Sequence, residues 1–418
     1  MDRKRTSWKL LFFIVLLATV FTIAGCGGKN GGQQPAKPAE SAAGKAGTPG
    51  SGGSEKPPAG PAAPAQPAAA GKVLRELIFL YSKIDEQKIV TADINGNNAT
   101  DVCSNIAATN KIFLSPDYKK ASSEGMMIGE NQSINIYYFD SSETRPVTVE
   151  GLLGGEVSRW SGDSKYLLVL ATPKYGSRDY KLFKVEVDTN RREQVKTEGI
   201  MGTSASQYLL NPVENSLIYY GKEQGDPAKA PVCHIFCKNL DTGAERSIIK
   251  LGDPGGLPQD MMVSPDGSKL LYILNGLHVV DIKSGSAVKM NVNVKATSLR
   301  DVAWSWDSSC LAVAGTVTVK PDAFGNQIRV IKDIQVYKVA DGSLVNTIPL
   351  GSDLYMVPSV SNNQLQWSSD NKHLVMIASS EAEKKKNLYR VPVSGGPVEK
   401  IVHVPDGYQI QWVVVKNK

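Results

Sequence analysis

The stretch MVSPDGSKLLYILNG, residues 262–276, places the turn Ser264-Pro265-Asp266-Gly267 between two apolar runs. Proline presets φ for a turn, the aspartate side chain accepts hydrogen bonds from nearby backbone amides, and glycine tolerates positive φ. Alone, this stretch predicts one β-hairpin. Its importance comes from repetition, because nearly the same phrase returns along the chain.

The repeated phrase begins with an apolar residue followed by a short polar turn. Copies of the phrase begin at Leu114, Trp160, Leu210, Val263, Trp304, Trp367 and Trp412. The copy at Leu210 is degraded, and the copy at Trp412 keeps only the apolar residue. Successive copies are 46, 50, 53, 41, 63 and 45 residues apart. Repeats of this length are typical of β-propeller blades.

A second phrase, a short strand that ends in a polar turn, follows within each repeat and occurs seven times. Its copies are KIVTADINGN (88–97), INIYYFDSSE (134–143), YKLFKVEVDTN (180–190), CHIFCKNLDTG (233–243), GLHVVDIKSG (276–285), IQVYKVADG (334–342) and NLYRVPVSGG (387–396). Runs rich in β-branched and aromatic residues separate the two phrases, and no segment keeps a helical period. Each repeat therefore predicts four strands.

The two ends of the repeat region predict how the ring closes. RELIFLYSKID, at 75–85, resembles a second strand without a first, and YQIQWVVVK, at 408–416, resembles a first strand without a successor. Together they make one blade, which closes six contiguous blades into a ring. The predicted fold class is all-β, a seven-bladed propeller, with six or eight blades as the less favoured alternatives.

The two phrases resemble the TolB-type, WD-like β-propeller repeat, which also occurs in propellers of prolyl-oligopeptidase relatives. The resemblance covers residues 73–418 and weakens at 119–129, where KKASSEGMMIG lacks an apolar strand. TolB has six blades and a separate α/β domain, and neither matches this chain. The resemblance implies inter-blade packing or turn capping, and no catalysis, for these residues: Trp160, Asp163, Asp266, Trp304, Asp307, Trp367, Asp370 and Trp412.

The first residues predict a lipoprotein signal peptide at 1–25. Four basic residues lie in Met1–Lys9, an apolar run follows at 10–22, and Ile23-Ala24-Gly25 precedes Cys26. This order resembles the lipobox of bacterial lipoproteins, which implies lipidation of Cys26 and attachment to the extracytoplasmic face of the cell membrane. An ordinary secretory signal with an incidental cysteine is the alternative.

Residues 26–72 predict a disordered tether that carries the lipidated cysteine. From 27 to 71 the chain is rich in Gly, Ala and Pro and has no aromatic residue, so it has too little apolar surface to fold. The formal net charge of the whole chain is +6, and removal of the signal peptide lowers it to about +3. This balance argues against nucleic acid as a partner.

The remaining cysteines, Cys103, Cys233, Cys237 and Cys310, are too few for a disulfide framework in a chain of this size. Cys233 and Cys237 lie four residues apart on a predicted strand, which excludes a mutual bridge unless the strand breaks. No metal site and no cofactor is predicted. DINGNNATDV, at 93–102, resembles a calcium loop at its start but lacks the sixth-position glycine and the final glutamate, so a plain turn is favoured.

Loop length predicts which face of the propeller binds. The tight turns share one face, and the longer connections at 172–180, 221–232, 315–333 and 379–387 share the other. Binding residues often lie in such loops on a rigid scaffold. Aromatic residues and arginine dominate binding hot spots, which makes these residues the candidate binding residues: Tyr175, Arg178, Phe324 and Arg329.

Two functions remain open. The first is a lipid-anchored binding or scaffolding module for a protein, peptide or glycan of the cell envelope. The second is a propeller enzyme, of the polysaccharide lyase or lactonase type, with a site in the central channel. A resemblance to the lyases of this repeat family would imply a metal held by clustered His and Gln side chains. The histidines of this chain are instead scattered through the sequence, at His234, His278, His373 and His403. The binding module is therefore favoured.

Overall fold

The computed structural model describes residues 75–416, apart from gaps at 84–85, 105, 107–111, 124–126, 129–130, 150–152, 173–180, 197–207, 223–231, 253–257, 259, 293–298, 322–325 and 358–363. The chain divides into two compact units, 1–65 and 66–418, and every described residue belongs to the second. Among the described residues no helix is long and apolar enough to cross a membrane. Their one helix is the short 3-10 turn η2 (Leu299–Asp301).

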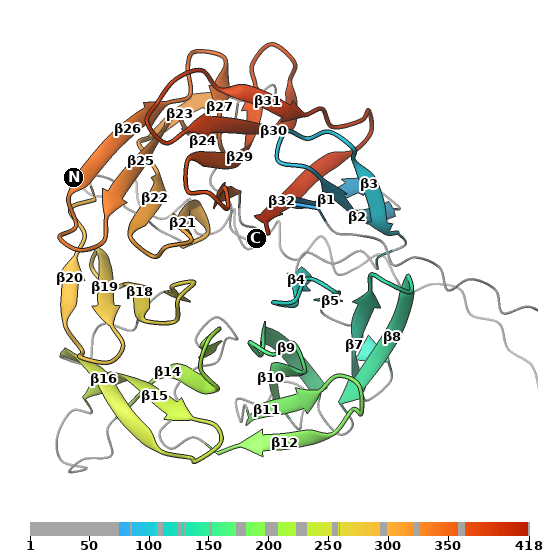
Figure 1. The fold of residues 1–418 in the computed structure, drawn as a ribbon, viewed down its shortest axis with the longest axis vertical. Coiled ribbons are helices and arrows are strands. Elements are labelled where there is room, and N and C mark those ends of the chain that lie inside the picture. The colour runs from blue at the N-terminus through green and yellow to red at the C-terminus, as the bar shows by residue number, and fades with distance from the viewer. Residues whose placement is uncertain are drawn as a thin grey trace, which may run out of the picture. The chain divides into compact units, whose positions relative to one another are not determined.

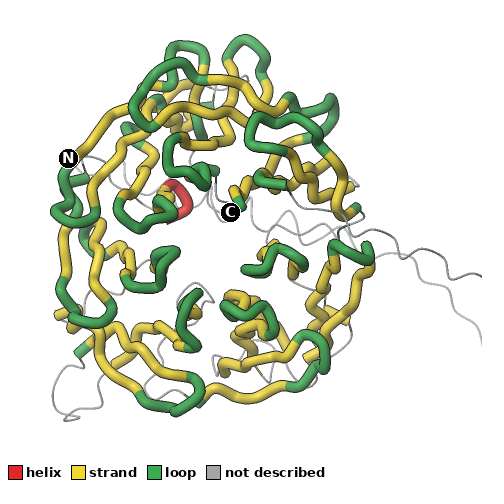
Figure 2. The backbone as a smooth tube through the Cα atoms, in the orientation of Figure 1, coloured by secondary structure: helices red, strands yellow, loops and turns green. Residues whose placement is uncertain are grey.

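The second unit is a ring of sheets, which we name blades A to G (Figures 1 and 2). Each blade has four main strands, which follow one another from the centre of the ring outward. Blade A consists of β32 (Gln409–Val415), β1 (Leu77–Lys83), β2 (Glu86–Ala92) and β3 (Thr100–Cys103). Blade B consists of β4 (Ile112–Leu114), β5 (Lys120–Ser123), β7 (Asn131–Tyr138) and β8 (Glu143–Val149), with β6 (Met127–Ile128) pairing β7. Blade C consists of β9 (Leu153–Trp160), β10 (Tyr166–Thr172), β11 (Lys181–Glu186) and β12 (Arg192–Val195).

The other blades repeat this arrangement. Blade D consists of β13 (Tyr208–Leu210), β14 (Ser216–Lys222), β15 (Cys233–Asn239) and β16 (Glu245–Gly252). Blade E consists of β17 (Met261–Val263), β18 (Lys269–Ile273), β19 (Leu277–Asp281) and β20 (Ala287–Lys289). Blade F consists of β21 (Val302–Trp304), β22 (Cys310–Ala314), β25 (Asp333–Lys338) and β26 (Leu344–Pro349), with the separate hairpin β23 (Val317–Pro321) and β24 (Gln327–Ile331). Blade G consists of β28 (Leu365–Trp367), β29 (His373–Ser380), β30 (Lys385–Pro392) and β31 (Glu399–Val402), with β27 (Leu354–Tyr355) pairing β29.

The seven-bladed, all-β prediction is confirmed, including the closure of the ring by both ends of the repeat region. β1 pairs antiparallel with β32, with Leu77 opposite Val415 and Ser82 opposite Gln409. The phrases at 75–85 and 408–416 therefore complete one blade. This closure ties the first described strand to the last and leaves each of the seven blades with four main strands.

The core of the propeller is a ring of interfaces between blades. Seven apolar clusters of buried residues each draw side chains from two neighbouring blades. The cluster between blades F and G, for example, packs Ala303 and Ile348 against Leu374 and Tyr389. Because every blade contributes to two clusters, its two faces are both covered, as alternating apolar strands require.

Tryptophan residues of four inner strands lie within these clusters. Trp160, Trp304, Trp367 and Trp412 are 3–7% exposed. The Trp160 indole N–H donates to the carbonyl of Phe113 at 2.9 Å, and that of Trp367 donates to the carbonyl of Ala303 at 3.0 Å. In both cases the acceptor lies on the inner strand of the preceding blade, so the ring stacks on a neighbour and also hydrogen-bonds to it.

The tight turns between the first two strands repeat one hydrogen-bond pattern. The serine hydroxyl donates to the aspartate carboxylate two residues later, at 2.5–2.6 Å, in the pairs Ser115–Asp117, Ser161–Asp163, Ser264–Asp266, Ser305–Asp307 and Ser368–Asp370. The same hydroxyl accepts the backbone N–H of the first residue of the next strand, as Lys269 shows at 2.9 Å. The aspartates therefore hold the turn shape.

The residue after each aspartate has positive φ, and in four of the five turns it hydrogen-bonds to the turn of a neighbouring blade. Ser164 accepts the backbone N–H of Asp117 at 3.0 Å, and Asn371 accepts that of Trp306 at 2.7 Å. At Gly267 the neighbour supplies the group instead, because the Asn211 amide donates to the Gly267 carbonyl. A Cβ on Gly267 would lie 2.4 Å from Asn211 Oδ1, so this close approach requires glycine.

Three local predictions need correction. Within 119–129, where the expected apolar strand is lacking, Lys120–Ser123 nevertheless forms β5, and its Ala121, Ser122 and Ser123 are buried. The segment 315–333, predicted as a loop, carries the β23–β24 hairpin. The segment 379–387 is mostly strand, because β29 and β30 pair from His373 opposite Pro392 to Ser380 opposite Lys385, which leaves only a four-residue turn.

Candidate functional site

The face opposite the tight turns is where blade F departs from the repeat. In this blade the connection between the second and third strands contains β23 and β24, which form a two-stranded sheet of their own. Their register runs from Val317 opposite Ile331 to Pro321 opposite Gln327. The β-branched residues that dominate TVTVK and IRVI explain why this insertion forms strands.

The base of the hairpin is fastened to the connection between blades F and G. Ile331 and Met356 exchange two backbone hydrogen bonds, of 2.8 and 3.0 Å. Gly315 N donates to the carbonyl of Asp333 at 2.9 Å and closes the start of the insertion. Val330 and Ile331 are 1% exposed, so the end of β24 belongs to the protein core. The hairpin is therefore held at its base.

A charged cluster braces the middle of the hairpin against blade G. Lys320 on β23 pairs with Glu381 in the turn between β29 and β30, and its ammonium group lies 3.5 Å from the centre of the Tyr355 ring. Partial burial disfavours the charged Lys320, but hydrogen bonds to Glu381 and Tyr355 outweigh it and raise the pKa of the amine. The same bond lowers the pKa of Glu381, so both partners stay charged at neutral pH.

The outward side of the hairpin presents an apolar residue beside a cation. Val319 and Arg329 are directly opposite each other across the two strands, and both are exposed. Val319 is 61% exposed, which is unusual for a large apolar residue in this protein. Since directly opposite side chains lie about 5 Å apart, the two residues form one small surface. We name this pair the hairpin surface.

Arg329 is thus the one predicted binding residue that lies within the described chain. Tyr175, Arg178 and Phe324 lie outside the described residues, and so does the predicted lipidation site Cys26. The structure adds Val319, which the sequence analysis missed. Its signal was present, because a run of β-branched residues on each side of a short connection predicts a hairpin.

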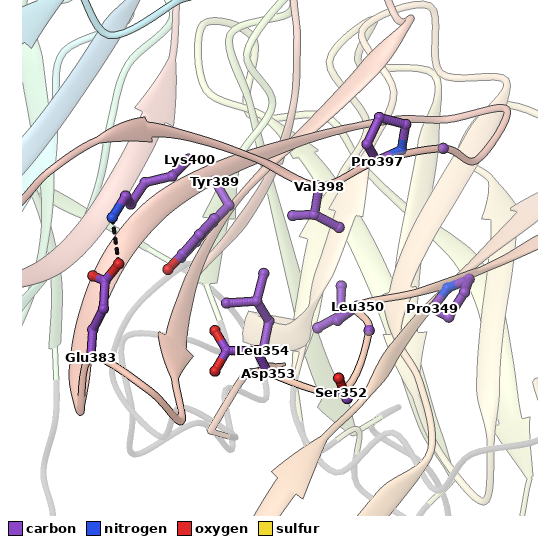
Figure 3. Close-up of a pocket in the computed structure, with 12 residues that line it drawn as sticks. Pro349, Leu350, Ser352, Asp353, Leu354, Glu383, Tyr389, Pro397, Val398 and Lys400 are labelled. Carbon is purple, nitrogen blue, oxygen red and sulfur yellow. Dashed lines mark hydrogen bonds and ion pairs between the residues drawn. The ribbon is translucent and has the colours of Figure 1, made fainter.

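An open pocket of about 500 Å³ lies between blades F and G (Figure 3). One wall is the end of β26 with the connection that follows it, and the other is formed by β30, β31 and the turn before β31. Figure 3 shows Leu350 and Leu354 on one side, facing Val398 on the other. Leu350, Leu354 and Tyr389 are 3–8% exposed, so the floor is apolar and shared with the core between the two blades.

The charged groups Glu383, Lys400 and Asp353 of the pocket have hydrogen-bond partners within the protein. Glu383 accepts a hydrogen bond from Lys400 at 2.5 Å, which lowers the pKa of Glu383 and raises that of Lys400. Asp353 accepts the Ser380 hydroxyl at 2.7 Å and the Ala382 backbone N–H at 2.8 Å, and these bonds lower its pKa. What the pocket offers to a ligand is therefore its apolar floor.

The histidines and cysteines have structural surroundings. His278 Nε2 lies 3.0 Å from the carbonyl oxygen of Leu274, and His234 Nδ1 lies 2.8 Å from the Ser247 hydroxyl. His373 begins β29 and His403 follows β31, so the four histidines lie in blades D, E and G. Among the described residues no group of three or more His, Cys, Asp and Glu side chains could hold a metal ion. Cys103, Cys233, Cys237 and Cys310 are not joined by disulfide bonds in the described part of the chain.

The segment that resembles a calcium loop is a turn. One carboxylate oxygen of Asp93 accepts the backbone N–H groups of Asn95 and Asn97, at 3.0 and 2.9 Å. The other accepts the Asn98 side-chain amide at 3.2 Å. The Asn95 side chain is also used, since it accepts a hydrogen bond from Arg390 of blade G at 2.6 Å. These oxygens hold the turn and its contact with the neighbouring blade.

No family model matches the chain, and no curated protein sequence matches it. The chain is similar to solved propeller structures. They include TolB from Acinetobacter baumannii (12% identity, 80% of this chain and 81% of that chain, TM-score 0.38) and an oligogalacturonate lyase from Vibrio parahaemolyticus (15%, 81% and 89%, 0.44). A third is the β-propeller domain of the Trilobed protease from Pyrococcus furiosus (11%, 82% and 98%, 0.46). Identities and scores this low carry no information on activity, and the fold rests on the sheet topology above.

Proposed function

We propose that the protein is a membrane-anchored, extracytoplasmic lipoprotein whose propeller is a binding or scaffolding module, and that the hairpin surface contacts a protein partner. The observation that carries this proposal is the braced hairpin. It departs from the repeat, and its fastening to blades F and G leaves Val319 and Arg329 exposed on a fixed support. A rigid support reduces the entropy cost of binding, and arginine is enriched among the residues that contribute most to binding energy.

The proposed anchor is tested separately from the proposed surface. Cys26→Ser removes the thiol that the lipobox would use for acylation. We expect the wild-type chain in the membrane fraction and the variant in the soluble fraction or retained with its uncut leader. Mass spectrometry of the N-terminal peptide measures the acyl chains directly. A wild-type chain with an intact, unacylated Cys26 would refute the anchor and leave the hairpin surface untouched.

The proposed surface is tested by charge reversal. Arg329→Glu changes one exposed cation on the hairpin, and Lys283→Glu makes the same change in an exposed tight turn of blade E on the opposite face. Cross-linked partners recovered with each full-length chain from envelope membranes are compared by quantitative mass spectrometry. We expect Arg329→Glu to reduce specific partners at least about tenfold, as loss of a hot-spot residue does. Equal recovery with both variants would contradict the proposal.

A further inference from the structure

The outer strand of blade F differs from the outer strands of the other blades. At least one charged residue is present in each of six described outer strands: β3, β8, β12, β16, β20 and β31. The seventh described outer strand, β26, has the sequence LVNTIP and contains no charged residue. Charged residues on an edge strand normally prevent other chains from pairing with it. In β26 this protection is missing, and Leu344 and Val345 are 45% and 57% exposed.

The backbone of β26 has hydrogen-bonding groups directed away from its own sheet. Leu350 N donates to the carbonyl of Lys332 at 2.9 Å, which makes Asp333–Pro349 a non-hydrogen-bonded pair. Thr347 lies two residues earlier and is opposite Gln335, so this pair is also a non-hydrogen-bonded pair. In an antiparallel ladder such pairs turn their N–H and C=O groups outward. Thr347 can therefore donate to and accept from an added strand.

The pocket lies at the end of this edge. Pro349 ends β26, and both Pro349 and Leu350 line the pocket on the side of blade G. A strand added along β26 points every second side chain toward blade G. One such side chain is then placed at the pocket mouth, and the apolar floor with its internally paired charges fits an uncharged apolar side chain.

A second copy of the chain does not supply that side chain. The residues of β26 on the blade G side are Asn346 and Ile348. The Asn346 amide donates to the carbonyl of Val393 at 2.9 Å, and Ile348 is 0% exposed in the core cluster. In an edge-to-edge pairing of two β26 strands, neither residue is free to enter the pocket of the other copy. The β26 strand of a second copy is therefore not the occupant of this pocket.

We propose that β26 accepts an extended, low-charge segment of a partner protein by β-strand addition, with one apolar side chain of the partner in the pocket between blades F and G. The proposal rests on the proposed binding function and adds a second contact to the hairpin surface. Main-chain hydrogen bonds to Thr347 supply affinity, and the pocket selects the side chain, as in other cases of strand addition.

The test uses a random dodecapeptide library displayed on phage and selected on the full-length protein. We expect enriched peptides with apolar residues at alternate positions and no proline in the centre. A synthetic peptide from this selection is measured by fluorescence anisotropy against Thr347→Pro and Thr347→Ala. Thr347→Pro removes only an outward N–H, a change that edge strands tolerate. It should weaken binding at least about tenfold, whereas Thr347→Ala should change it less than about twofold.

Two further measurements keep the result decisive. In the wild-type protein the peptide should slow hydrogen exchange of the Thr347 amide, a result that does not depend on whether the proline variant folds. Val398→Asp should weaken binding of the same peptide through the pocket. No enriched peptide, equal binding to the proline and alanine variants, or a β26-dependent dimer without peptide binding would each overturn the proposal.

These outcomes are distinct from those of the proposed function. Loss of cellular partners in Arg329→Glu without any peptide binding to β26 would refute strand addition alone. Peptide binding at β26 together with unchanged partners in Arg329→Glu would refute the role of the hairpin surface alone.

Discussion

The two faces of the propeller use sequence differently. On the tight-turn face, five turns repeat the same hydrogen bond from serine to aspartate. Ser164 and Asn371, which follow two of these aspartates, also accept hydrogen bonds from the turn of the neighbouring blade. On the opposite face, blade F carries a hairpin that none of the other six blades repeats among the described residues. Repetition indicates that one structural requirement is met many times, whereas a single departure calls for a local explanation. We therefore assign the fold to the first face and binding to the second.

The largest expected effect belongs to the core beneath the tight turns. Trp367→Ala removes a side chain that is 3% exposed and a hydrogen bond to the preceding blade. We expect a loss of about 3–5 kcal/mol in the free energy of unfolding, measured by urea denaturation. Val319→Ala on the hairpin should cost less than about 0.5 kcal/mol. Similar losses in the free energy of unfolding for Trp367→Ala and Val319→Ala would contradict the assignment of the fold to the tight-turn face and of binding to the hairpin face.

A smaller effect is expected at the close approach of two turns. Gly267→Ala places a Cβ 2.4 Å from Asn211 Oδ1 at a residue with φ of 71°. Gly351→Ala is the matched control, because Gly351 has φ of 82° but nothing within 4 Å of its added Cβ. Both variants lose about 1 kcal/mol to positive φ, and Gly267→Ala should cost at least about 1 kcal/mol more. Thermal unfolding of the pair measures that difference, and equal midpoints would contradict the account.

The turn aspartates predict acid sensitivity. Burial would raise the pKa of Asp266, but hydrogen bonds from Ser264, Ser268 and Ser308 outweigh it and lower this pKa to about 2. A lowered folded pKa contributes stability that is present above the ordinary aspartate value and is lost as the pH falls toward 2. Asp266→Asn should therefore flatten the decline in stability between pH 4 and pH 2, measured by urea denaturation. An unchanged pH profile would show that this carboxylate contributes nothing to stability.

The smallest expected effect on stability lies in the brace of the hairpin. Lys320→Ala removes the pair with Glu381 and the contact with Tyr355, and Lys320 is 22% exposed. We expect at most about 1 kcal/mol of global destabilisation, as for a partly exposed ion pair. Hydrogen exchange in β23 and β24 should nevertheless accelerate, while exchange in β18 and β19 of blade E stays constant. Unchanged hydrogen exchange in the hairpin would mean that the contacts at its base hold it in place without the Lys320 pair.

The fold was predictable because each blade repeats the same local chemistry. The serine–aspartate turns, the anchors such as Trp160 and the unmatched strands at the two ends together indicated seven blades. The β23–β24 hairpin was missed because a segment of this length was interpreted as a loop, although TVTVK and IRVI are rich in β-branched residues. Ser379, Ser380 and Lys385 looked like loop residues because polar composition hides the extension of β29 and β30.

The pocket was beyond sequence analysis. Its lining comes from three separate segments, at 349–354, 383–389 and 396–400, and each is an ordinary strand end or turn. Only the stacking of blades F and G brings Leu354 opposite Val398. Arg329 was predicted from its residue type, but its partner Val319 follows from strand register, which a loop assignment does not provide.

The central claim is that the hairpin face binds and the tight-turn face does not. Val319 and Val213 allow a direct test, since the first is 61% exposed on β23 and the second is 66% exposed in a tight turn of blade D. Each is replaced in the full-length chain by the same photo-cross-linking amino acid, and cross-linked products from cells are compared. The account predicts a discrete protein adduct from position 319 and none from position 213. An adduct from position 213, or none from position 319, would contradict it.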